Sequence, residues 1–169
     1  MSFQFLTPEL ARWDSLAAAT AGAPELLVVP FFADERPLRG AAGLCDWRMC
    51  GRLSRWIQSG RIDGELGETA LLPAKRLVFH KLLLVGLGES EQFVEARFRE
   101  VARVIAGVVK RLAVTRYAMP LPGRSTGRLA ARRALELWLA EVGDAGELWL
   151  IEPTSAQKDM SEVLGKRVK

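Results

Sequence analysis

The chain has 169 residues, of which 49% are hydrophobic and 26% charged, and its formal net charge is +4 at pH 7. This length and composition are those of one globular domain spanning residues 1–169, and no repeat, low-complexity stretch or long linker divides it. The small positive charge permits contact with nucleic acid or acidic partners. The residues that carry it lie in arginine-rich predicted helices and do not form a basic tail.

The sequence indicates neither export nor membrane insertion. Glu9, Arg12 and Asp14 interrupt the N-terminal stretch where a signal peptide needs a continuous apolar run. The apolar runs from Leu26 to Ala33 and from Leu82 to Leu87 are too short to cross a bilayer. We therefore expect a cytoplasmic protein with no membrane contact.

The two cysteines, Cys45 and Cys50, lie five residues apart, a spacing that fits neither a redox pair nor a zinc site. Cys50 falls on an apolar helical stripe, so we expect it to be a small side chain of the core. The other members of the stripe are Met49, Leu53, Trp56 and Ile57. A disulfide is not expected, which agrees with a reducing compartment.

The first part of the chain predicts two strands and two helices. Phe3 to Leu6 is a short strand candidate, and Pro8 to Ala19 is a short helix candidate. Leu26 to Phe32 is a continuous apolar run typical of a buried strand. Asp34 to Gly43 is a polar loop, and a helix from Leu44 to Ser59 ends at a glycine stop.

The second part continues the alternation of strands and helices. Glu68 to Pro73 and Arg76 to Val85 predict a hairpin, and a helix with a clear apolar stripe begins near Ser90. The stripe consists of Val94, Phe98, Val101, Ile105, Val108 and Leu112. The remaining candidates are a strand from Arg116 to Leu121, a helix from Thr126 to Val142, a strand from Glu147 to Glu152 and a helix from Ser155 to Leu164.

This pattern predicts an α/β fold, a three-layer sandwich with a mixed central sheet and helices on both faces. The run from Leu82 to Gly88 supports the prediction most directly, because a buried parallel strand that leads straight into its crossover helix is typical of such folds.

Three segments, taken in order and with their spacing, resemble the N-terminal domain of the leucyl (cytosol) aminopeptidases. They are Leu44-Cys45-Asp46 followed by Gly51 and Leu53, then Ile62-Asp63-Gly64 followed by Gly67-Glu68, and then Leu82 to Gly88. The resemblance extends from about Leu26 to the end of the chain and implies a macro-domain-like fold. In that family the domain lies on the outside of an oligomer, which implies a homo-oligomer or a protein partner here.

The resemblance does not extend to the chemistry of the family. Peptidase activity there belongs to a separate C-terminal domain, in which a lysine, several carboxylates and an Asn-Thr-Asp-Ala-Glu-Gly-Arg signature hold two metal ions. This sequence contains no asparagine, so that signature is absent. We therefore expect no enzymatic activity, no catalytic residue, no metal site and no cofactor.

The turn Gly86-Leu87-Gly88 is one candidate ligand site, because a strand-to-helix turn brings backbone amides close to a phosphate in some folds. A dinucleotide fingerprint needs a third glycine three residues later, where this chain has Glu91. Gly86 and Gly88 are therefore kept as candidates, and a tight packing turn is the favoured alternative.

The loop from Pro122 to Arg128 is the second candidate. It follows a strand, opens the next predicted helix and offers an anion Gly123, Arg124, Ser125, Thr126, Gly127 and Arg128. Its Ser-Thr-Gly run resembles the phosphate-binding loop of ADP-ribose-binding macro domains. Those domains also use an asparagine near the end of an early strand, where this chain reads Val28-Val29-Pro30-Phe31-Phe32. A helix cap with solvated arginines is the alternative.

Two further features receive structural interpretations. His80, the sole histidine, is expected in a strand, since no second histidine or nucleophile elbow accompanies it. The arginines of two long helices offer a nucleic-acid surface as an alternative, but the glutamates between them favour a solvated, salt-bridged surface. These arginines include Arg97, Arg99, Arg103, Arg128, Arg132 and Arg133.

The sequence thus favours a non-catalytic domain of the leucyl aminopeptidase N-terminal type with a binding, scaffolding or regulatory role. The alternatives are a nucleotide or ADP-ribose-type ligand binder that uses the Pro122–Arg128 loop, and an accessory chain of a metallo-aminopeptidase. Trp13 lies on a short helix and either covers the sheet edge or forms a contact patch for assembly. The tryptophans expected in the core are Trp47, Trp56, Trp138 and Trp149.

Overall fold

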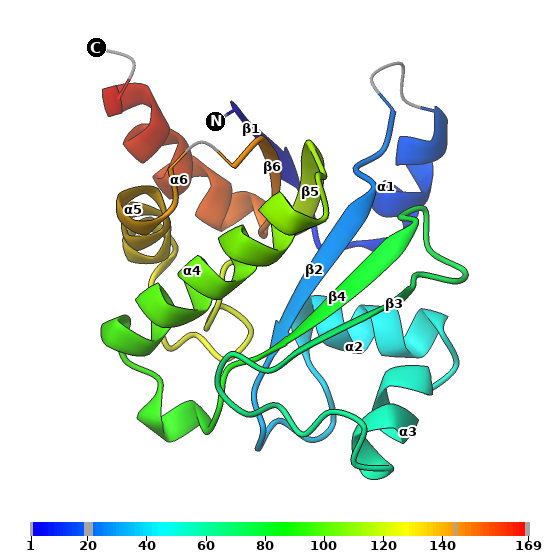
Figure 1. Cartoon of the computed structure of the whole chain (residues 1–169). Helices are drawn as coiled ribbons and strands as arrows, with labels where there is room; N and C mark the ends of the chain where they lie inside the picture. Colours follow the sequence, from blue (N-terminus) through cyan, green and yellow to red (C-terminus); the bar gives the residue numbers. More distant parts are fainter. Residues whose placement is uncertain (1, 19–21, 144, 168–169) are drawn as a thin grey trace.

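Six strands of the computed structural model form one mixed sheet in the order β1-β6-β5-β2-β4-β3 (Figure 1). The structure describes residues 2–18, 22–143 and 145–167. The strands are β1 (Ser2–Leu6), β2 (Leu26–Phe31), β3 (Thr69–Pro73), β4 (Lys81–Gly86), β5 (Arg116–Met119) and β6 (Glu147–Ile151). The helices are α1 (Leu10–Ser15), α2 (Gly40–Arg48), α3 (Arg52–Gln58), α4 (Glu95–Arg111), α5 (Ala131–Glu141) and α6 (Thr154–Arg167), with short 3-10 turns η1 (Leu16–Ala18) and η2 (Ser90–Gln92).

β2 lies inside the sheet between β5 and β4. All neighbouring strands pair in parallel except β3, which runs antiparallel to β4 at one edge. Every residue of β2 is buried, because helices cover both faces of the sheet and a strand in that position needs apolar side chains on each side.

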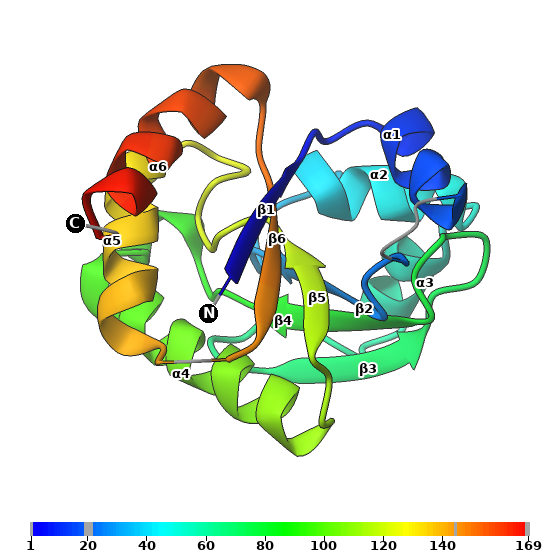
Figure 2. The ribbon, with the colours of Figure 1, turned by 90° about the horizontal axis from the view of Figure 1, so that it is seen from above.

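The helices form two layers, with α1, α2 and α3 on one face and α4, α5 and α6 on the other (Figures 1 and 2). Alternate residues of β2 enter the two cores: Leu26 and Val28 join the α4–α6 side, whereas Leu27 and Val29 join the α1–α3 side. This arrangement confirms the predicted three-layer α/β sandwich with a mixed sheet.

The helix expected from Leu44 to Ser59 is wrong in extent. α2 begins at Gly40, inside the expected polar loop, and a break separates it from α3. Cys50 and Gly51 cause the break, because both have left-handed backbones, with φ of 57° and 75°. The expected core position of Cys50 is also wrong: its side chain is exposed, and the buried cysteine is Cys45.

The tryptophans differ from their expected positions as well. Trp47 is 74% exposed on α2, so its expected place in the core is wrong. Trp13 is only 1% exposed and meets Phe79 edge to face with ring centroids 5.8 Å apart, so its helix covers the sheet and forms no contact patch. Trp138 is buried, and Trp56 and Trp149 are half-buried.

Turns shift the starts of several strands and helices from their expected positions. β4 begins at Lys81 rather than Arg76, because Arg76 has a φ of 69° and the segment up to His80 folds into turns. His80 therefore precedes the strand and is exposed. The helix expected near Ser90 starts as η2, and α4 proper begins at Glu95, which leaves Val94 of the expected core stripe 56% exposed.

The helix expected from Thr126 begins later, as α5 at Ala131. Two turns occupy the intervening residues: the Gly127 amide donates to the Arg124 carbonyl at 3.2 Å, and the Arg128 amide donates to the Gly123 carbonyl at 3.2 Å. Ala19, the last residue of the helix expected from Pro8, lies outside the described residues. No helix within the described ranges is both long and apolar enough to span a membrane.

Candidate functional site

The connections leaving β2 and β5 run in opposite directions across the sheet. After β2 the chain passes through α2 and α3 to β3 and β4, whereas after β5 it passes through α5 to β6 on the other side. Loops that leave the carboxyl ends of such neighbouring strands diverge, and ligands of open α/β sheets bind in the crevice between them. A ligand site is therefore expected at the carboxyl ends of β2 and β5.

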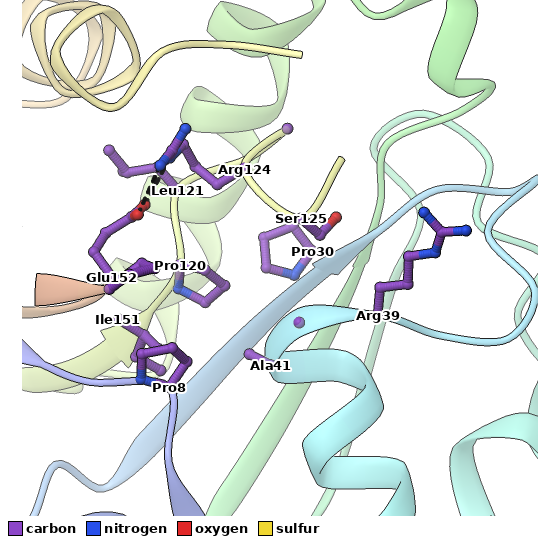
Figure 3. Close-up of a pocket in the computed structure, with 13 residues that line it drawn as sticks. Pro8, Pro30, Arg39, Ala41, Pro120, Leu121, Arg124, Ser125, Ile151 and Glu152 are labelled. Carbon is purple, nitrogen blue, oxygen red and sulfur yellow. Dashed lines mark hydrogen bonds and ion pairs between the residues drawn. The ribbon is translucent and has the colours of Figure 1, made fainter. Parts of the chain in front are cut away.

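A cavity of about 190 Å³, which we name the apolar pocket, lies at this point (Figure 3). Its wall is formed where strands end: Pro30 belongs to β2, Pro120 follows β5, Ile151 ends β6 and Pro8 follows β1. Proline rings and aliphatic side chains make this wall rigid and water-repelling. The polar lining residues are Arg39, Arg124, Ser125 and Glu152.

Arg124 does not offer a free charge to a ligand. Its Nε and Nη2 donate to the two carboxylate oxygens of Glu152 at 2.9 and 3.0 Å, and its Nη1 donates to the Leu129 carbonyl at 2.7 Å. The side chain of Glu152 is only 2% exposed and that of Arg124 17%. Arg124 therefore ties the loop after β5 to the end of β6, as the dashed lines in Figure 3 show.

Arg39 lies on the opposite side of the apolar pocket from that ion pair (Figure 3). It is exposed and forms no ion pair with another described residue. It also lines a second cavity of about 150 Å³, which we name the polar pocket. The other residues of the polar pocket are Asp34, Glu35, Arg36, Ser90 and Thr126.

Glu35 is the buried acid of the polar pocket, with 6% of its surface exposed. One carboxylate oxygen, Oε2, accepts from the Phe32 amide and from the Ser125 hydroxyl, both at 3.4 Å. The other, Oε1, is buried without a hydrogen-bond partner among the described residues. Burial raises the pKa of Glu35, although the Phe32 amide, the Ser125 hydroxyl, and the charge and backbone amide of Arg39 act in the opposite direction.

Asp34 and Ser90 hold the outer wall of the polar pocket. The Ser90 hydroxyl and amide donate to the Asp34 carboxylate at 2.6 and 3.0 Å, which joins the loop after β2 to η2. These hydrogen bonds lower the pKa of Asp34. Thr126 contributes a hydroxyl oxygen that is buried without a partner in the described part of the chain.

The other members of the expected anion loop are divided by the structure. Ser125 lines the apolar pocket and Thr126 the polar pocket, whereas Gly127 and Arg128 are exposed and line neither. Gly123 has a φ of 77°, and an added Cβ there lies 2.7 Å from the Phe93 ring, so close packing requires a glycine. Because α5 starts at Ala131, the loop amides do not form a helix N-terminus.

Gly86 and Gly88 line neither pocket and are covered by the chain itself. An added Cβ at Gly86 lies 2.0 Å from the Glu65 carbonyl oxygen, and the Gly88 amide donates to the Gly64 carbonyl at 2.8 Å. The covering loop is held by Glu68, whose Oε2 accepts from the amides of residues 63, 64 and 65. Two of the sequence segments that resemble the aminopeptidase domain therefore pack on each other, and the turn is a packing turn.

The arginines of α4 and α5 are engaged by glutamates. Arg99 contacts Glu141 at 2.6 Å, and Arg133 contacts Glu95 at 2.6 Å. Further pairs join Arg103 to Glu141, Arg133 to Glu136 and Arg132 to Glu162. This surface carries mixed charges held in pairs, which favours the solvated interpretation over a nucleic-acid surface.

Four residues that line the polar pocket were not predicted from the sequence: Asp34, Glu35, Arg39 and Ser90. They belong to segments that read as a polar loop and a helix start, and no local spacing marks them. One signal was present, because charged residues that directly follow an apolar central strand lie at the carboxyl edge of the sheet.

The sequence profile of the cytosol aminopeptidase family, N-terminal domain, matches residues 28–140. This chain belongs to that family. Similar curated proteins include a probable cytosol aminopeptidase of Thioalkalivibrio sulfidiphilus, 31% identical over 99 residues that cover 55% of this chain and 20% of that protein. A probable cytosol aminopeptidase of Burkholderia mallei is 31% identical over 111 residues, which cover 62% of this chain and 22% of that protein. The chain thus spans about a fifth of the length of these relatives.

Solved structures agree with the macro-domain-like fold. A Trypanosoma brucei macrodomain in complex with ADP superposes with a TM-score of 0.71 at 13% identity, over 96% of this chain and 68% of that one. An Oceanobacillus iheyensis macrodomain with ADP gives 0.67 at 11% identity, over 86% and 85%. Tomato leucine aminopeptidase gives 0.62 at 13% identity, over 95% of this chain and 35% of that one. At these identities the likeness shows the fold alone.

Proposed function

We propose that this cytosol aminopeptidase N-terminal domain is a non-catalytic binding module, and that it binds a small ligand bearing an anionic group in the cleft formed by the apolar and polar pockets. The observation that carries the proposal is Arg39, an exposed guanidinium without an ion pair in the described structure that lines both cavities. An arginine in this position offers paired donors to a carboxylate or phosphate. The role of such binding is regulatory or scaffolding. Its place is the cytoplasm, in agreement with the word cytosol in the names of the relatives.

The position of the cleft supports this proposal. It lies at the switch point of the sheet, and its walls come from loops that other parts of the chain hold in place: Arg124 is fixed by Glu152, and Asp34 by Ser90. A site on rigid supports loses little entropy on binding. Arg39 replaces Arg124 and Arg128 as the expected source of positive charge.

The non-catalytic part of the proposal rests on what the family match covers and on the side chains present. The profile matches an N-terminal domain, and within the described ranges no three His, Cys, Asp or Glu side chains gather as a metal site requires. We expect the purified chain to hydrolyse no leucyl-amide substrate, with or without added zinc or manganese. Turnover that disappears when carboxylates of this chain are replaced would contradict this expectation.

Calorimetric titration tests the binding site directly. The titrants are inorganic phosphate, ADP, ADP-ribose and 4-methylpentanoate, which between them offer phosphate and carboxylate groups. We expect at least one of them to bind, and Arg39→Gln to weaken that binding by about tenfold or more because one charge-assisted contact is lost. Arg103→Gln is the matched control, since the Arg103 side chain is 64% exposed and lines neither pocket. Unchanged binding in Arg39→Gln would refute the site.

A second candidate function, assembly, is favoured by a different observation. Trp47 is 74% exposed and lines a shallow depression with Arg48, Cys50 and Arg76. A tryptophan with this much free surface is typical of a contact residue. The assembly role is compatible with ligand binding, because Trp47 lines neither pocket of the cleft.

A further inference from the structure

The polar pocket contains equal numbers of acids and arginines, and two of these four residues are satisfied by the chain itself. Arg36 donates to the carbonyls of Phe32 and Glu35 at 3.2 and 2.8 Å, and Asp34 accepts from Ser90. The other two are Glu35, whose buried carboxylate accepts hydrogen bonds of 3.4 Å from Phe32 and Ser125 and is acted on by the charge and backbone amide of Arg39, and Arg39 itself, whose side chain forms no ion pair with a described residue. The pocket, of about 150 Å³, thus offers a ligand one negatively charged hydrogen-bond acceptor and one positively charged hydrogen-bond donor.

We propose that the cleft binds a small zwitterion, an α-amino acid with an apolar side chain. Its ammonium group pairs with the Glu35 carboxylate, its carboxylate accepts from the Arg39 guanidinium, and its side chain enters the apolar pocket between Pro30 and Pro120. The inference rests on the proposed function, because both assign the anionic group of the ligand to Arg39.

The position of the two pockets suits such a ligand. Arg39 lines both, and Ser125, which lines the apolar pocket, donates its hydroxyl to the Glu35 carboxylate at 3.4 Å. A molecule held by Glu35 and Arg39 therefore has the apolar pocket beside it. An ammonium and a carboxylate separated by one carbon atom match two opposite charges that line one small cavity.

Charge and volume both favour an amino acid over a nucleotide. A diphosphate carries at least two negative charges, and in the polar pocket it would face Asp34 and Glu35 as well as Arg36, whose guanidinium is engaged by backbone carbonyls, and Arg39. Like charges at such short range oppose binding. The cavities measure about 190 and 150 Å³, below the roughly 300–1,000 Å³ of sites for drug-sized ligands.

Matched ligands separate the two charges of the zwitterion. The purified chain is titrated calorimetrically with L-leucine, with 4-methylpentanoate, which lacks the ammonium group, with leucine amide, which lacks the carboxylate, and with ADP. We expect L-leucine to bind at least about tenfold more tightly than either analogue, since each lacks one charge-assisted contact. Glu35→Gln should abolish the preference over 4-methylpentanoate, and Arg39→Gln the preference over leucine amide, whereas Arg103→Gln should keep both.

The outcomes distinguish this inference from the proposed function. If 4-methylpentanoate binds as tightly as L-leucine and needs Arg39, or if ADP binds more tightly than L-leucine, the zwitterion is refuted and the anion site stands. If no titrant, phosphate and ADP-ribose included, binds at millimolar concentration, both fail. The unsubstituted chain gives a second readout: L-leucine should shift the backbone amide NMR signals of Phe32, Arg39 and Ser125, and absence of these shifts would also refute the inference.

Discussion

Glu35 and Glu152 are the buried carboxyl groups of the described residues, and only Glu152 has an arginine within ion-pair distance. Burial raises the pKa of Glu35 above its ordinary value of 4.5, so the folded state holds the proton to higher pH than the unfolded state does. The contribution of the Glu35 carboxyl to the free energy of unfolding is therefore greatest below pH 4.5. It falls as the pH rises through the raised pKa of the folded state.

The resulting prediction concerns Glu35→Gln. The glutamine cannot ionise, so we expect the variant to be more stable than the parent at pH 7, and this advantage to shrink as pH falls toward 4.5. Urea unfolding at a series of pH values measures the difference in the free energy of unfolding. A variant that is less stable than the parent at every pH would show that the charged carboxylate is stabilised by its surroundings.

The Arg124–Glu152 pair gives a second prediction at the residue scale. Arg124→Met leaves the carboxylate of Glu152 buried without its cation, and we expect a loss of about 3–5 kcal/mol in the free energy of unfolding. The double variant Arg124→Met/Glu152→Leu should recover much of this loss. The control is Arg132→Met, which breaks a pair with side chains 43% and 56% exposed and should cost at most about 1 kcal/mol. Equal losses in the two single variants would contradict the assignment.

At the scale of elements, Asp46 holds the break between α2 and α3. Its Oδ1 accepts from the amides of Leu53 and Ser54 at 2.8 and 3.1 Å, and its Oδ2 accepts from the Ser54 hydroxyl. It thus satisfies the first amides of a seven-residue helix whose own N-cap, Gly51, has no side chain to do so. This explains the spacing of the first sequence segment that resembles the aminopeptidase domain.

We therefore predict that Asp46→Ala lowers the free energy of unfolding by about 1 kcal/mol, a typical cost of losing an N-cap. Asp46→Asn keeps an oxygen acceptor and should cost less. Thermal unfolding monitored by circular dichroism compares the three proteins. If the asparagine variant loses as much as the alanine variant, the negative charge rather than the capping geometry holds the joint.

Some elements of the fold are determined by the local sequence, and others are not. The apolar runs that became β2 and β4 were predicted because buried parallel strands need consecutive apolar residues. The joint at Cys50 was missed, because a left-handed cysteine is set by the packing of two helices and not by its own preference. The late start of α5 was also missed, since the Arg124–Glu152 pair that fixes the preceding loop joins residues 28 apart.

At the scale of the whole molecule, the family segments and the cleft serve different purposes. The segments around Asp46, Glu68 and Gly86 hold helices and loops in place, whereas the cleft residues Glu35 and Arg39 lie outside those segments. A resemblance carried by scaffold residues therefore predicts the fold but leaves the ligand undetermined. The site becomes visible only when the topology makes β2 and β5 parallel neighbours, so that their carboxyl ends lie toward the same edge of the sheet.

Assembly depends on which apolar side chains are exposed on the surface of the molecule. The burial of Trp13 excludes one of the two alternatives that the sequence offers for it, a contact patch, and Trp47, at 74%, is the most exposed large apolar side chain of the described residues. We predict that two copies of the chain associate through Trp47, so light scattering over a concentration series should show a dimer, and Trp47→Ser should shift the protein to monomer. Reducing agent must be present, because exposed Cys50 lines the same depression and a disulfide between copies would mimic association. Val94→Ser, which removes another exposed apolar side chain, is the control and should leave the dimer intact. A strictly monomeric parent at high concentration would exclude self-association and leave Trp47 available only to a different partner.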